Sequence, residues 1–150
     1  MKKITLAFKK SWHKDGSDGW YAFLIWLRTF SSYCHVEIKF SNGDSWSSVD
    51  GEGGVRFKKI AYSHPYRWEF VEIPIDKLPK KYKNEQELYE DCKTIKGHYD
   101  WIGIALNEGI PLGIEDKTKW YCSEVIAFAL GLKKYSISPG SLYDRIKKML

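Results

Sequence analysis

Hydrophobic and polar residues alternate along much of the first half of the chain, which predicts β-strands. Ile4, Leu6 and Phe8 alternate with their neighbours, and a period of two is typical of a half-buried strand. An Asn42-Gly43 dipeptide between two such runs is a strong hairpin signal. The pattern predicts five strands in all, over residues 3–9, 34–40, 44–49, 54–60 and 68–75.

Other segments have the length and apolar pattern of helices. The run from Val125 to Leu132 is apolar throughout and predicts a buried helix. Pro139 stands where a proline suits the first turn of a final helix. The predicted helices cover residues 20–30, 84–96, about 97–106, the segment opening at Cys122 and the segment after Ser138. This order indicates an α+β fold in which one antiparallel sheet packs against helices.

Length and cysteine content narrow the class of protein. The chain has 150 residues, which is the size of one domain, and without repeats or linkers we expect a single domain over residues 1–150. Its three cysteines, Cys34, Cys92 and Cys122, are odd in number and lack zinc spacing, so we expect neither a disulfide framework nor a metal site. We also expect no cofactor, and a reducing compartment suits these thiols.

Charge and hydropathy bear on partners and location. The net charge of +5 comes from 24 basic and 19 acidic residues, and short lysine pairs spread along the chain are typical of a solvated surface. We therefore expect no nucleic-acid partner. The apolar start stops at Lys9-Lys10, too early for a signal peptide, and Arg28 interrupts a second run too short to cross a membrane. These features predict a cytoplasmic protein without a transmembrane segment.

A candidate nucleophile opens the predicted buried helix. Cys122 lies in the segment Trp120-Tyr121-Cys122-Ser123-Glu124, at the start of the apolar run. The N–H groups and dipole of a helix start favour a thiolate. The alternative interpretation is a cysteine that is simply buried on an apolar helix.

A candidate base lies on the second predicted strand. His35 would be held stiffly there, and Glu37 falls on the same face because strand side chains alternate. Glu37 could orient the imidazole, or it could be an exposed carboxylate paired with Lys39. Ser47, on the next strand, could also bond the ring, so the residues alone leave the third group open.

The chain resembles the circularly permuted NlpC-type papain-like proteins, especially the YiiX-like branch and small phage-encoded relatives. The resemblance spans about residues 4–145 and rests on the order and spacing of Cys34-His35-Val36-Glu37-Ile38, Gly54-Val55-Arg56-Phe57, Tyr99-Asp100-Trp101, Tyr121-Cys122-Ser123-Glu124 and Ser138-Pro139-Gly140-Ser141-Leu142-Tyr143. It implies a papain-like α+β fold with Cys122 as nucleophile and His35 as base. It also implies a polar third residue, near Ser47 or Ser48 in relatives, although we favour Glu37.

The resemblance further implies a cysteine hydrolase, a peptidase or amidase that forms a thioester at Cys122. Expected substrates are peptides, peptidoglycan fragments or protein isopeptides, and a phage-encoded member could act in the virion or at the envelope. A lipid acyltransferase or phospholipase could use the same pair on lipid acyl groups. A third hypothesis is a non-catalytic module that binds a peptide or glycan. The pattern assigns no oligomeric state.

Overall fold

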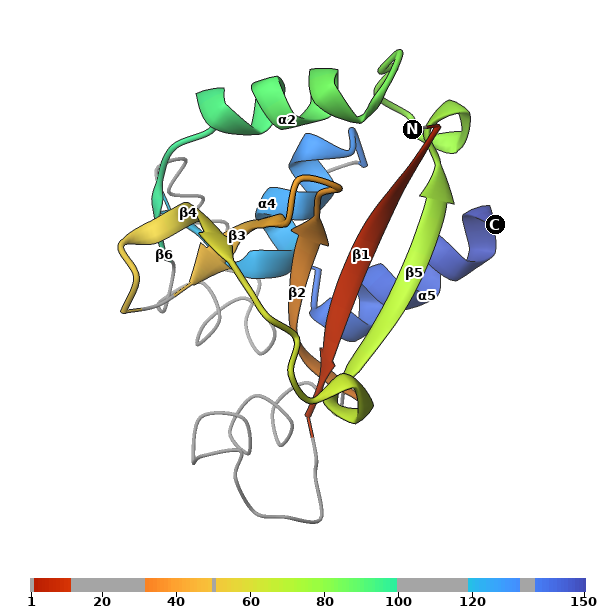
Figure 1. Ribbon diagram of the computed structural model, residues 1–150. Coiled ribbons are helices and arrows are strands. Elements are labelled where there is room, and N and C mark those ends of the chain that lie inside the picture. Colours follow the sequence, from red (N-terminus) through yellow and green to blue (C-terminus); the bar gives the residue numbers. More distant parts are fainter. Residues whose placement is uncertain (1, 12–31, 50, 100–118, 133–136) are drawn as a thin grey trace, which may run out of the picture.

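The computed structural model describes residues 2–11, 32–49, 51–99, 119–132 and 137–150 (Figure 1). The predicted helix over residues 20–30 and most of the one over about 97–106 lie outside these ranges, and where the start of the latter is described, residues 98–99 form a strand instead. The strands are β1 (Lys3–Lys10), β2 (Tyr33–Lys39), β3 (Asp44–Val49), β4 (Gly54–Lys59), β5 (Trp68–Pro74), β6 (His98–Tyr99) and β7 (Lys119–Trp120). The helices are α2 (Glu85–Thr94), α4 (Cys122–Ala129) and α5 (Pro139–Met149), with 3₁₀ turns η1 (Pro65–Arg67) and η2 (Ile75–Lys77).

The first five strands form one antiparallel sheet in the order β4-β3-β2-β1-β5. All five predicted strands are confirmed, each within one residue of its expected ends. The expectation of a single sheet was wrong, because β6 and β7 form a second, parallel pair. Two-residue strands are too short to show an alternating pattern, so the sequence gives no signal for them.

Helices α4 and α5 pack against the central strand β2, and α4 also packs against β3 (Figure 1). β1 contributes Ile4, Leu6 and Phe8 to the core, all buried as the alternation predicted. The predicted buried helix is confirmed, since every residue of α4 except Phe128 is buried. This burial removes apolar surface from water and fixes α4 against the sheet.

Helix ends also follow local chemistry. Asn84 caps α2 by accepting from the backbone N–H of Glu87 at 3.0 Å, as expected for an amide side chain at that position. Cys92 on α2 is fully buried in the core, as a small apolar residue would be. Pro139 occupies the first turn of α5 as predicted.

No helix in the described part of the chain combines the length and apolarity needed to cross a membrane.

Strands β2 and β3 pair over only part of their length. Their register joins Ile38 to Trp46 and Lys39 to Ser45, next to the turn, whereas β3 pairs with β4 from end to end. The half of β2 that precedes Ile38 therefore has no ladder partner on β3, although it pairs with β1 along its other edge.

Candidate active site

Cys122 is the first residue of α4. The preceding Tyr121 is extended, and its carbonyl accepts from the N–H groups of Glu124 at 3.1 Å and Val125 at 3.2 Å. The helix therefore begins where the sequence predicted. The Cys122 residue is only 3 % exposed, and it lies at the positive end of the helix dipole, which favours an anionic sulfur.

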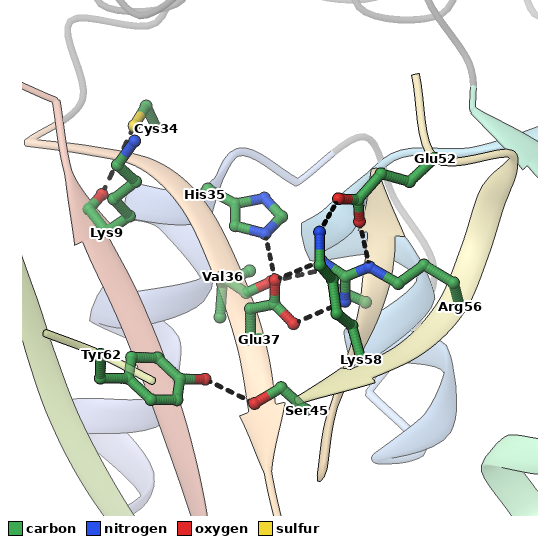
Figure 2. Close-up of polar contacts among 11 residues, drawn as sticks. Lys9, Cys34, His35, Val36, Glu37, Ser45, Glu52, Arg56, Lys58 and Tyr62 are labelled. Carbon is green, nitrogen blue, oxygen red and sulfur yellow. Dashed lines mark hydrogen bonds and ion pairs between the residues drawn. The ribbon is translucent and has the colours of Figure 1, made fainter. Parts of the chain in front are cut away.

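His35 lies on the half of β2 that pairs with β1 but not with β3, and its side chain is 20 % exposed. Its Nε2 is 2.9 Å from Oε1 of Glu37 (Figure 2). An ionised carboxylate only accepts hydrogen bonds, so Nε2 carries the proton in this contact. That leaves Nδ1 as the nitrogen that can exchange a proton with a thiol.

The Cys122 side chain interacts with His35 by charge and by a hydrogen bond. Burial alone would lower the pKa of His35, but Cys122 and then Glu37 raise it to about 9. A cationic imidazole is thus favoured while the sulfur is anionic.

Glu37 is held by Arg56 as well as by His35. Arg56 donates from Nη2 to Oε1 at 2.8 Å and from Nη1 to Oε2 at 2.9 Å (Figure 2). Burial would raise the pKa of Glu37, whose side chain is 1 % exposed, but the Arg56 and His35 contacts lower it to about 2. Glu37 is therefore an ionised acceptor at neutral pH.

Ser47 has a different partner from the one that sequence reasoning considered. Its hydroxyl donates to the carbonyl of Val36 at 2.7 Å, across the region where β2 and β3 lack ladder bonds. The structure thus brings Cys122, His35 and Glu37 together, with Glu37 bonded to the ring and Ser47 bonded to the backbone beside it.

The alternative in which Glu37 is an exposed carboxylate paired with Lys39 is wrong. Glu37 is buried, and its ion pairs are with His35 and Arg56. Lys39 instead lies over the ring of Tyr62 at 5.3 Å and that of Phe70 at 5.1 Å. The difference arises because Arg56 offers two donors to a buried carboxylate, while Lys39 remains among aromatic rings.

Arg56 is the residue at this site that sequence reasoning gave no role. It stands two residues before Lys58 and Lys59 in the same strand, so it looks like an ordinary surface cation. The information that places Arg56 at the site lies in the strand register, because Arg56 on β4 is paired with Ser47 on β3. Continuing the pairing of β2 with β3 would put Ser47 opposite Glu37, which aligns the three residues in one row across the sheet.

Within the described ranges, no group of three or more His, Cys, Asp or Glu side chains could hold a metal ion. All three cysteines are free and buried.

Comparison with protein-family models, with curated proteins and with solved structures finds no match to the chain.

Proposed function

We propose that this protein is a cysteine hydrolase, a peptidase or amidase with a papain-like fold of the permuted NlpC type. The observation that carries the proposal is the arrangement around His35. Its ring interacts with Cys122 at a helix start and with the buried Glu37 carboxylate. A nucleophile, a base in contact with it and a third group that orients the base are what acyl transfer by a thiol requires.

In the first half of the proposed reaction, the Cys122 thiolate attacks the carbonyl carbon of an amide. The carbonyl oxygen becomes an oxyanion, and the backbone N–H of Cys122 at the helix start is one donor to it. As the C–N bond breaks, the His35 imidazolium gives its proton to the departing amine. The products are a free amine and a thioester on Cys122.

In the second half, neutral His35 accepts a proton from water, and the hydroxide equivalent attacks the thioester carbon. The C–S bond breaks, a carboxylic acid leaves, and the thiolate–imidazolium pair is restored. Glu37 stays ionised throughout, accepting from Nε2 and stabilising the imidazolium. Peptidoglycan peptides and protein isopeptides are the amides to screen first.

The first test is the pH dependence of iodoacetamide alkylation at each cysteine, read by mass spectrometry. We expect Cys122 to react well below pH 8 and far faster than the other two thiols, because only a thiolate is nucleophilic. Cys92 is a built-in control, since burial raises the pKa of its thiol. Cys34 is a second control thiol. Its Sγ lies 3.7 Å from the carbonyl oxygens of Lys9 and Lys10, which are acceptors for a protonated thiol.

The decisive comparison is between His35→Ala and a matched variant, His64→Ala, which removes a histidine from an exposed loop. We expect His35→Ala to abolish the advantage of Cys122 and His64→Ala to preserve it. If Cys122 instead stays inert until the pH nears about 8.5, the usual pKa of a thiol, or if His35→Ala changes nothing, the hydrolase proposal fails. A non-catalytic binding module would then take its place.

A further inference from the structure

A row of alternating charges runs outward from the imidazole. Glu37 lies between His35 and Arg56, and Arg56 lies between Glu37 and Glu52 (Figure 2). Arg56 Nε donates to Oε2 of Glu52 at 2.6 Å, and Glu52 also accepts from Lys58. The row begins at a buried carboxylate and ends at a half-exposed lysine side chain.

The Arg56 guanidinium is fixed on both of its sides. Its two terminal nitrogens bind the two oxygens of Glu37, a bidentate geometry that constrains the plane of the carboxylate. Its Nε is bound to Glu52, so the side chain is anchored within its own hairpin. Only 13 % of the Arg56 side chain is exposed, and its contacts are therefore poorly screened by solvent.

The strand register explains how Arg56 reaches Glu37. Arg56 on β4 is paired with Ser47 on β3, and strands lie about 4.8 Å apart. The small Ser47 side chain is tied down to the carbonyl of Val36. A long arginine can therefore extend over the serine to the carboxylate on β2.

Without Arg56, the carboxylate would meet two difficulties. Burial favours the protonated form of a carboxylate that has lost one of its two cationic partners, and a protonated Glu37 could donate to Nε2 rather than accept from it. The carboxylate could also rotate, because His35 binds only one of its oxygens. Either change would disturb which ring nitrogen faces Cys122.

We propose that Arg56 is a positioning residue of the active site, which keeps Glu37 ionised and in the one orientation that directs Nδ1 of His35 toward Cys122. The inference rests on the proposed function and extends it by one residue. Arg56 itself touches neither thiol nor substrate. It acts on the chemistry only through the carboxylate.

If the ion pair between Arg56 and Glu37 were merely structural, a different experimental result would be expected. Its loss would lower stability, as loss of any partly buried pair does, without moving the pH dependence of a thiol. The alkylation profile of Cys122 therefore separates the two roles, provided that the variants are folded. Circular dichroism and urea unfolding establish folding for each variant before alkylation.

The experiment compares wild type with Arg56→Met, Arg56→Lys and Lys80→Met. We expect Arg56→Met to move the acid limb of the Cys122 profile to higher pH and to slow alkylation at pH 6 by about tenfold, the effect of a one-unit change in pKa. Arg56→Lys should recover much of the shift, since a charge remains, but not the full rate, since lysine lacks the fork. Lys80→Met breaks a remote 2.6 Å ion pair with Asp91 and should leave the profile unchanged.

A wild-type profile in both Arg56→Met and Arg56→Lys would overturn the inference. The double variant Glu37→Gln/Arg56→Met removes both charges and avoids a buried unpaired carboxylate, so it keeps the test valid if Arg56→Met does not fold. It should be no slower than Glu37→Gln alone if Arg56 acts only through Glu37, and additive losses would contradict that. Failure of the proposed function is recognised separately, because wild-type Cys122 would then show no advantage.

Discussion

The two oxygens of Glu37 have different partners, and this asymmetry organises the site at the scale of single residues. Oε1 accepts from both His35 and Arg56, whereas Oε2 accepts from Arg56. The carboxylate is thus held by three hydrogen bonds from two cationic side chains while it is buried, which is the condition under which a buried charge is tolerated. The orientation of the ring follows from the orientation of the acid.

At this scale we predict that the His35 pKa depends on Cys122. The Cys122 side chain is the largest influence that raises this pKa, so Cys122→Ala should lower the titration midpoint from about 9. NMR of the ring resonances against pH measures it. Cys34→Ala, which removes the thiol of the adjacent residue, should leave the midpoint in place, and an unchanged midpoint in Cys122→Ala would refute the thiol–imidazole coupling.

At the scale of elements, both ends of α4 are well defined. Its first residue is Cys122, and its last turn closes on Gly131, where φ is +75°. The N–H of Gly131 bonds the carbonyl of Phe128 at 3.0 Å, and the N–H of Leu132 bonds that of Ala127 at 2.8 Å, which is a Schellman ending. Lys80 backbone packs closely against the glycine, so the helix has little freedom to slide.

We predict that Gly131→Ala destabilises the protein more than Gly51→Ala does. Both glycines have φ of +75°, but a Cβ at Gly51 meets open space, while one at Gly131 would lie 2.6 Å from the Lys80 backbone nitrogen. Both changes cost about 1 kcal/mol for the backbone conformation, and steric crowding at Gly131 adds about 1–3 kcal/mol. Urea unfolding measures the difference, and equal losses would contradict the close contact.

Much of this element structure was predictable from sequence, for identifiable reasons. Alternation located the five strands, and the apolar run after Cys122 located α4, because each signal extends over many residues. Arg56 gave no such signal, since its role depends on the order β4-β3-β2 and on the small Ser47 between its strand and β2. The choice between Glu37 and Ser47 depended on where a hydroxyl finds its acceptor, which no pattern specifies.

At the scale of the whole molecule, Glu37 and His35 set limits on the pH range in which the protein is most stable. Glu37 has its pKa lowered from 4.5 to about 2, so its contribution to stability is present above 4.5 and is lost as the pH falls through 2. His35 has its pKa raised from 6.5 to about 9, so its contribution is present below 6.5 and is lost as the pH rises through 9. Both contributions to stability are therefore fully present only between about pH 4.5 and pH 6.5.

We therefore predict that Glu37→Gln flattens the fall in unfolding free energy between pH 4.5 and pH 2, because the variant has no carboxylate to protonate at this position. Urea unfolding at several pH values measures the slope. Glu90→Gln is the matched control, since Glu90 is an exposed carboxylate paired with Lys93 whose contact solvent screens. An equal slope in Glu37→Gln and wild type would show that Glu37 does not carry this pH dependence.

The pairing of β3 with β4 limits which insertions and deletions are compatible with the site. The two strands are in register from Asp44 opposite Lys59 to Val49 opposite Gly54, and only residues 50–53 connect them. One residue inserted or deleted there can shift this register, and a one-step shift turns every β4 side chain to the other face. Arg56 would then be replaced by Val55 or Phe57 in front of Glu37. A change in the length of this connection, remote from Cys122 in sequence, is thus expected to disrupt the contact between Arg56 and Glu37.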